Sequence, residues 1–179
     1  MSGHSKWNNI KNKKGAQDAK RSQIFTSLVK NIRIAAKNGG DPDGNPNLRL
    51  WIEKAKAANM PKDKIQRAID IGCGKYANGK MQEIVYEAFG PGGVAIMLTT
   101  ITDNTNRMSG EIKALLSRFG GSMGGPGSAK YLFEFDKNTQ EFTCLMPMEV
   151  DEQLREKLSE LKNKLFEIDG IEGVFLAIS

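Results

Sequence analysis

Apolar residues recur at helical spacing in three segments of the first half of the chain. The first segment spans 21–38 and ends at Gly39-Gly40, and the second begins at Pro46 after a turn-rich stretch. The third follows Pro61 and ends at the glycines around Cys73. Steps of three and four residues are typical of a helix with one buried face, and Pro and Gly mark its ends. The pattern predicts three helices with short connections, which form a small bundle.

The apolar period changes from about 3.6 to about 2 after a polar stretch at 75–80, which we interpret as a linker. Residues 82–89 and 93–101 alternate as strands do, and the turn at 90–93 predicts that they form a hairpin. The remaining elements are two helices, at 105–119 and 150–168, and three strands, at 129–135, 141–147 and 172–178. These elements predict a mixed or antiparallel sheet with two helices on one side.

The fold class expected from these patterns is α+β, with an N-terminal three-helix bundle followed by an α+β domain. Residues 1–20 have no apolar period beyond Trp7 and Ile10, so we expect a basic arm there. The three-helix domain is expected at 21–75 and the α+β domain at 81–179. A chain of 179 residues suits one domain or two small ones and excludes a large multidomain enzyme.

Several classes of protein are disfavoured by what the sequence lacks. No run approaches the 18 to 20 or so apolar residues of a membrane span, and the N-terminus lacks the apolar segment of a secretory signal. We therefore expect a cytoplasmic protein, or an organelle-matrix protein if a presequence has been removed. Cys73 and Cys144 are each isolated and His4 is the single histidine, so we expect no metal, no cofactor, no small-molecule substrate and no enzymatic activity.

Charge is distributed very unevenly between the two halves. Residues 1–80 carry 17 Lys and Arg against 6 Asp and Glu, a net charge of +11, whereas residues 81–179 carry 9 against 15, a net charge of −6. The first forty residues alone hold nine basic groups and one acid, Asp18. Such asymmetry predicts a nucleic-acid partner, because clustered cations attract phosphates whatever the base sequence. A solvated basic face that only keeps the protein in solution is the alternative interpretation.

The candidate contact residues are the cations of the arm and first helix, together with one aromatic residue. They are Lys6, Trp7, Lys11, Lys13, Lys14, Lys20, Arg21, Lys30, Arg33 and Lys37. An aromatic ring between cations suits stacking on an exposed base while the cations hold the backbone. In the alternative interpretation, Trp7 and Ile10 anchor the arm to the bundle by burying their apolar surface.

Two other features resemble sites and have simpler explanations. The glycine-rich stretches 90–93 and 120–128 lack the Lys-Ser/Thr ending of a phosphate-binding loop, which favours hairpin and connector roles. A polar cluster at 103–107 lies where a strand meets a helix. Helix capping explains most of this cluster, and a binding site is the alternative.

A series of short motifs occurs in a fixed order between residue 3 and about residue 135. It includes Gly3-His4-Ser5-Lys6-Trp7, Gly40-Asp41-Pro42, Ala58-Asn59-Met60-Pro61, Gly90-Pro91-Gly92-Gly93 and Thr102-Asp103-Asn104. In this order the motifs closely resemble the YebC/PmpR family. The resemblance implies an N-terminal three-helix domain followed by α+β domains, and a role in gene expression through nucleic acid.

The resemblance also implies which residues make the contact and where this chain departs from the family. Matched residue by residue, the implied contact surface is the basic arm and the start of the first helix, from Lys6 to Arg21. Typical members are longer, with a further α+β domain after the strand that ends here near Phe135. We expect a shortened member that lacks this inserted domain, in which 145–179 is the family's C-terminal helix and strand.

Members of the family have been described as DNA-binding transcriptional regulators and as translation factors, including the mitochondrial translational activator of cytochrome c oxidase subunit I. We expect a translation role, in which the arm binds the ribosome, ribosomal RNA or transfer RNA, since such contacts need cations and stacking but no base-reading code. A regulator that binds duplex DNA is the alternative, although the long turn after the first helix is unlike a helix-turn-helix. A module that binds only protein is a third possibility. Attraction to phosphate is common to RNA and DNA, so the sequence leaves both open.

Overall fold

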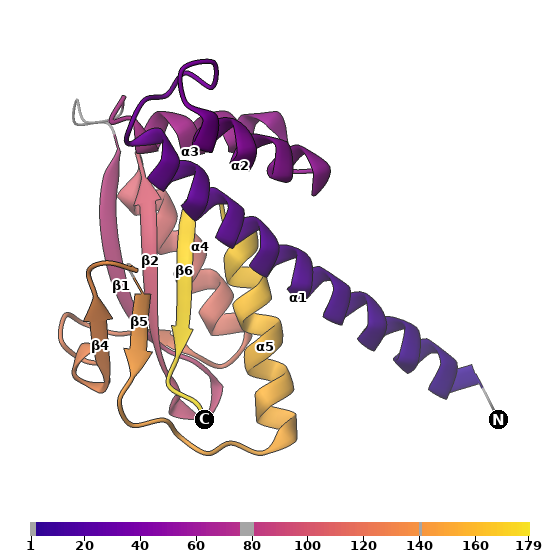
Figure 1. Cartoon of the computed structure of the whole chain (residues 1–179). Coiled ribbons are helices and arrows are strands. Elements are labelled where there is room, and N and C mark those ends of the chain that lie inside the picture. The colour runs from indigo at the N-terminus through magenta and orange to yellow at the C-terminus, as the bar shows by residue number, and fades with distance from the viewer. Residues whose placement is uncertain (1–2, 76–80, 140) are drawn as a thin grey trace. The chain divides into compact units, whose positions relative to one another are not determined.

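The computed structural model describes residues 3–75, 81–139 and 141–179; side chains at 3–16, 18, 19 and 22 lie outside the described part. The chain divides into two compact units, residues 1–80 and 81–179 (Figure 1). The first unit is helical and the second combines helices with antiparallel strands. The α+β class expected from the sequence is confirmed.

Unit 1 consists of three helices around one apolar core. They are α1 (Gly3–Ala36), α2 (Pro46–Ala57) and α3 (Lys62–Gly72). The core is made of aliphatic side chains from all three helices, namely Leu28, Ile32, Ala35, Ala36, Leu48, Ile52, Ala55, Met60, Ile65, Ala68 and Ile69. The three helices were therefore correctly predicted, and α2 begins at Pro46 and α3 ends at Gly72 as the sequence indicated.

Two residues fix how the helices of unit 1 meet. Asn45 is buried; its Oδ1 accepts the Leu48 N–H at 3.1 Å, and its Nδ2 donates to the carbonyls of Ala35 at 2.8 Å and Gly39 at 2.9 Å. One side chain thus caps α2 and ties it to the end of α1. Gly72 lies so close to the Arg33 carbonyl that a Cβ would collide with it. The absence of a side chain therefore permits α3 to pack closely on α1.

The expected basic arm is corrected by the structure. We expected an arm at 1–20 and a first helix from Arg21, but α1 begins at Gly3 and continues to Ala36. The sequence analysis relied on an apolar stripe, which marks a helix that packs on a core. A helix that has already formed can extend without such a stripe, because adding residues to it requires no new nucleation. The Lys, Ala and Gln residues of this stretch favour helix, and no proline interrupts it.

Unit 2 contains a four-stranded antiparallel sheet in the order β3-β1-β2-β6. The strands of this sheet are β1 (Gln82–Phe89), β2 (Ala95–Thr102), β3 (Ser122–Met123) and β6 (Ile171–Leu176). The other elements are α4 (Thr105–Arg118), α5 (Glu152–Glu167), β4 (Phe133–Asp136), β5 (Glu141–Cys144) and two short 3₁₀ turns, η1 (Pro91–Gly93) and η2 (Lys130–Leu132). The hairpin predicted from the turn at 90–93 is the β1–β2 pair.

Both faces of this sheet are covered. Ile96 and Leu98 of β2 pack with α4 and α5, as the sequence predicted for one face. Met97, which points to the other face, packs with Phe133 and Phe142 of the β4–β5 pair. We expected all strands in one layer, but β4 and β5 form a second sheet. Their phenylalanines shield the apolar residues that β2 presents on its second side.

Candidate nucleic-acid interface

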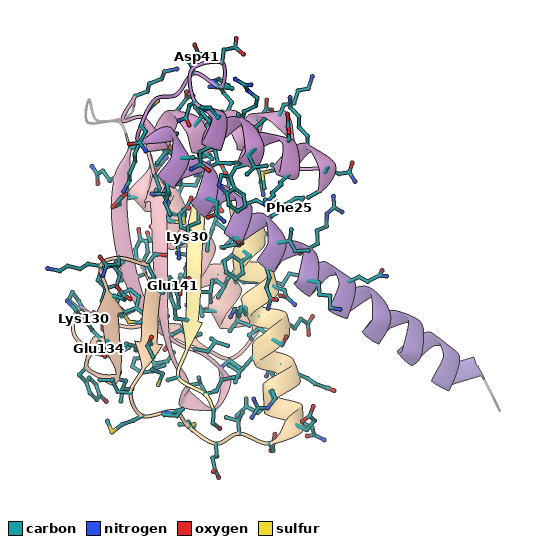
Figure 2. The ribbon with its side chains drawn as sticks, in the orientation of Figure 1. Phe25, Lys30, Asp41, Lys130, Glu134 and Glu141 are labelled. Carbon is teal, nitrogen blue, oxygen red and sulfur yellow. The ribbon has the colours of Figure 1, made fainter. Side chains whose placement is uncertain are left out.

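The described residues of α1 that belong to the core of unit 1 lie in the C-terminal part of the helix. The core residues of this helix begin at Phe25 and Leu28. On the N-terminal side of Phe25, which Figure 2 labels, the side chains that the structure describes are exposed. They are Gln17, Lys20, Arg21, Gln23 and Ile24. A helix of 34 residues is about 51 Å long at 1.5 Å per residue. α1 therefore presents a long stretch of helix whose described side chains face solvent.

The described candidate cations lie on this exposed stretch of α1 and near the C-terminal end of the helix. Lys20, Arg21 and Lys37 are exposed, and Lys30 and Arg33 are half-buried and engage neighbouring groups. Positions 30 and 33 are three residues apart on α1 and so are neighbours on the helix surface. Lys37 directly follows Ala36, the last residue of the helix.

Arg21 is further ordered by an aromatic neighbour. Its guanidinium carbon lies 5.3 Å from the centroid of the Phe25 ring, which is within the range of a cation–π contact. Because Phe25 itself packs on the core, the contact holds Arg21 in a defined position at the edge of unit 1. A pre-positioned guanidinium loses less conformational entropy when it binds a phosphate.

Five candidate residues have side chains outside the described residues, namely Lys6, Trp7, Lys11, Lys13 and Lys14. Their backbone belongs to α1. Residues 6, 13 and 20 are seven positions apart, so their lysines repeat every 10.5 Å or so along the helix axis. The stacking and anchoring interpretations of Trp7 both remain predictions.

The structure shows a cation on an aromatic ring in α2, where the sequence reasoning had not placed one. Lys54 Nζ lies 4.3 Å from the centroid of the Trp51 ring, and Trp51 is half-buried against the core. Trp51 was not among the contact residues predicted from the sequence. The i, i+3 spacing of Trp51 and Lys54 was the signal that could have revealed the pair. Lys54 covers the exposed face of the ring and so competes with any base that would stack there.

Not every cation of unit 1 is available to a ligand. The Arg49 guanidinium donates to the Pro42 carbonyl at 3.1 and 3.2 Å and to the Asp43 carbonyl at 3.0 Å. These bonds close the turn between α1 and α2. Arg49 therefore has a structural role.

The glycine-rich stretch 120–128 is held by a carboxylate of the chain itself. Glu87 of β1 accepts the backbone N–H groups of Gly127 at 2.6 Å, Ala129 at 2.7 Å and Lys130 at 2.8 Å. Burial opposes ionisation of Glu87, but these bonds and the charge of Lys130 outweigh it and hold the pKa below the ordinary value. Amides that could have cradled a phosphate are already occupied, which supports the connector interpretation of this loop.

The polar cluster at 103–107 is largely explained by capping. Asn104 Oδ1 accepts the Arg107 N–H at 3.0 Å at the start of α4, and Thr102 Oγ1 accepts the Asn104 N–H at 3.1 Å. Arg107 and Asp103 are an exposed pair 3.9 Å apart, an arrangement that contributes little to stability. The described geometry therefore supports capping at this strand-to-helix junction.

The described residues offer neither a metal site nor a membrane-spanning helix. Within residues 3–75, 81–139 and 141–179, no three His, Cys, Asp or Glu side chains are grouped so that they could hold a metal ion. In the same ranges, no helix is both long and apolar enough to cross a membrane.

Comparison with family models gives two matches in tandem. Residues 5–75 match the model of the TACO1/YebC protein N-terminal domain, and residues 81–140 match the model of the TACO1/YebC second and third domain. The two matches meet at the boundary between units 1 and 2. The second match ends in the turn between β4 and β5.

Individual relatives cover the same region. A probable transcriptional regulatory protein of Petrotoga mobilis is 55% identical over 135 residues, which are 75% of this chain and 54% of that protein. One of the same name from Treponema pallidum is 48% identical over 158 residues, or 84% of this chain and 64% of that protein. The chain thus spans about half the length of most of the curated relatives it matches.

A solved structure has a similar fold. The crystal structure of a conserved hypothetical protein from Aquifex aeolicus superposes with a TM-score of 0.61 at 26% sequence identity. The superposition covers 90% of this chain and 91% of that one.

Proposed function

Because the chain belongs to the TACO1/YebC family, we propose that it regulates gene expression by binding nucleic acid through the basic side of α1. Within that role, we place its action in translation, with ribosomal RNA, transfer RNA or the assembled ribosome as the partner. Such a role would place the protein with ribosomes in the cytoplasm, or in an organelle matrix.

The observation that carries the proposal is the exposed basic part of α1. Lys20 and Arg21 are solvent-exposed on a helix that continues beyond the core of unit 1, and Lys37 is exposed just after its C-terminal end. Together with the sequence charge of +11 for residues 1–80, this arrangement supplies phosphate contacts spread over several helical turns.

The negative charge of unit 2 restricts which part of the protein a nucleic acid contacts. Residues 81–179 carry a net charge of −6, so phosphates repel this unit while they attract unit 1. A polyanion that contacts α1 and avoids unit 2 gains the attraction and escapes the repulsion. Structured RNA suits this mode, because its recognition through phosphates and exposed bases needs no base-reading helix in a major groove.

Duplex DNA is the second candidate, and two observations favour it. The relatives carry the name probable transcriptional regulatory protein. In addition, α2 and α3 are joined by only four residues, 58–61, which is the length of a helix-turn-helix connection. However, Gln66 on α3 donates to Asp70 Oδ1 at 2.9 Å, so this polar side chain of the candidate reading helix is engaged within its own helix.

A salt titration with a matched control tests the proposed surface. We expect Lys20→Ala, Arg21→Ala and Lys37→Ala combined to weaken binding to an RNA hairpin and to lower the slope of log K against log salt by up to about one per lost contact. Fluorescence anisotropy of a labelled hairpin at several salt concentrations measures this slope. The control, Lys113→Ala, Lys137→Ala and Lys157→Ala, removes the same charge from exposed positions of unit 2.

The two triple variants separate a surface effect from an effect of net charge. Equal slopes for both variants would show that α1 has no special role. A loss in the α1 variant alone, with an unchanged melting temperature, supports the assignment. Running the same series with a DNA duplex of random sequence shows which nucleic acid binds more tightly at each salt concentration.

A further inference from the structure

We propose that the chain associates with a second copy of itself, with α1 of each copy seated on an apolar, acidic surface of the other copy's unit 2. The surface lies at the base of the β4–β5 hairpin and consists of Tyr131, Leu145, Met146 and Met148, which we call the hairpin-base patch.

The hairpin-base patch is unusually exposed for its composition. Tyr131 is 67% exposed, Leu145 55%, Met146 62% and Met148 43%. Single exposed apolar residues are common, but several in one place mark a surface that binds another molecule. Two of the four are methionines, whose flexible thioethers adapt to the shape of a partner.

Backbone hydrogen bonds hold the patch together. β4 and β5 pair with Phe133 opposite Cys144, and the Leu145 N–H donates to the Leu132 carbonyl at 2.8 Å, one step beyond that pair. Tyr131 lies in η2, directly before Leu132, and Met146 directly follows Leu145. Met148 is fixed by its N–H bond to the Ala177 carbonyl, 2.9 Å long. The patch is therefore part of the ordered fold of unit 2.

The surroundings of the patch are acidic. Residues 130–152 contain six Asp and Glu against two lysines, and Glu134 and Glu149 are exposed beside the apolar residues. Figure 2 shows Glu134 and Lys130 on this hairpin. A partner must therefore combine apolar side chains with positive charge, since like charges would repel it.

The exposed part of α1 has these two properties. Gln17, Lys20, Arg21 and Ile24 are separated by three, one and three residues, so they lie on one helical face. All four are exposed, and Ile24 is 51% exposed. The sequence continues this spacing toward the N-terminus with Trp7, Ile10, Lys13 and Lys14. We call Gln17, Lys20, Arg21 and Ile24 the outer face of α1.

A second copy supplies the complementary surface without any further component. The net charges of +11 for residues 1–80 and −6 for residues 81–179 attract each other between molecules. If each copy gives its outer face to the patch of the other, the two contacts are related by a two-fold axis and the assembly closes as a dimer. The further consequence, that nucleic acid and a second copy compete for α1, rests on the proposed function.

Sedimentation velocity of the full chain tests the association. Between about 1 and 100 μM we expect a concentration-dependent dimer in about 0.05 M salt that dissociates in about 0.5 M salt, where ion pairs between exposed charges are screened. Leu145→Ser with Met146→Ser should weaken the dimer at least tenfold or so, as expected for two buried apolar contacts. Ile34→Ser with Leu50→Ser is the control, because these exposed residues lie on α1 and α2 outside both surfaces.

A charge exchange makes the test specific. Lys20→Glu with Arg21→Glu should abolish the dimer, and the addition of Glu134→Lys with Glu149→Lys in the same chain should restore it. A chain that stays monomeric at every concentration would overturn the proposal. So would a dimer that the patch variant and the control variant weaken equally, or a charge exchange that restores nothing.

The failure of this proposal can be distinguished from failure of the proposed function. The Leu145→Ser, Met146→Ser variant keeps every cation of unit 1, so it should bind the RNA hairpin at least as tightly as the unaltered chain. If the chain binds RNA but forms no dimer, only the proposal of self-association is overturned. If it forms a dimer but does not bind RNA, only the proposed nucleic-acid role is overturned.

Discussion

At the scale of single residues, Glu87 explains the composition of the loop that follows α4. Its side chain accepts three backbone N–H groups, and its own carbonyl accepts the Gly124 N–H at 2.8 Å. Gly121 approaches the Phe89 carbonyl so closely that a Cβ would collide with it. The absence of a side chain at Gly121 is therefore required by the packing of this loop on β1.

The stability contributed by Glu87 depends on pH in a defined direction. Its folded-state pKa lies below the ordinary value of 4.5, so the carboxylate stabilises the fold above that pH. The contribution is lost as the pH falls through the folded-state pKa. Glu87→Gln should lower the free energy of unfolding at pH 7 by about 1 to 2 kcal/mol, since bonds to an ionised acceptor are replaced by weaker ones.

Urea unfolding of both proteins at pH 7 and near pH 3 measures this effect. We expect the difference between them to shrink at the lower pH, because the stability contributed by the Glu87 carboxylate is lost as the pH falls through its lowered folded-state pKa. Glu111→Gln, an exposed position on α4, is the control and should change stability little at either pH. A difference that is the same at both pH values would contradict the role assigned to the Glu87 charge.

At the scale of elements, local chemistry allowed most boundaries to be predicted. Pro46, Gly72 and the turn at 90–93 each restrict the backbone within a few residues, so α2, α3 and the β1–β2 hairpin were found. The separate β4–β5 sheet was missed, because its placement depends on the contact of Phe133 and Phe142 with a strand some forty residues away. The helical start of α1 was missed because its sequence has no apolar period beyond Trp7 and Ile10.

In the candidate site, too, features set by local sequence were predicted and features that depend on tertiary contacts were not. The charge of α1 follows from composition, so Lys20, Arg21, Lys30, Arg33 and Lys37 could be predicted from the sequence. The pairing of Lys54 with Trp51 depends on side-chain conformations, and the closure of the α1–α2 turn by Arg49 depends on the path of the loop. The i, i+3 spacing of Trp51 and Lys54 was a signal for the first contact. Arg49 has no sequence pattern that distinguishes it from an ordinary exposed cation.

The continuity of α1 can be tested at Gly15, in the middle of its N-terminal half. Proline costs a helix interior about 3 kcal/mol relative to alanine, whereas glycine costs about 1 kcal/mol. Gly15→Pro should therefore reduce the helix signal in circular dichroism and weaken RNA binding, and the matched Gly15→Ala should preserve both. The melting temperature should stay unchanged, because the described core of unit 1 begins at Phe25. Equal helicity and RNA affinity in the two variants would refute a continuous functional helix.

At the scale of the whole molecule, the family models and the charge distribution divide the chain at the same place. The matches end at 75 and resume at 81, and the net charge changes from +11 to −6 across that boundary. The second match ends at 140, and the chain covers 54% of the Petrotoga mobilis relative.

The most direct test of the translation role is co-sedimentation of the full chain with ribosomes at a fixed physiological salt concentration, with an excess of random duplex DNA as competitor. The Lys20→Ala, Arg21→Ala, Lys37→Ala variant and its unit 2 control are run in parallel. We predict that the chain pellets with ribosomes despite the duplex, that the α1 variant does not, and that the unit 2 control does. Loss of ribosome binding to the competitor, with tight duplex binding in its place, would contradict the translation role and favour regulation at DNA.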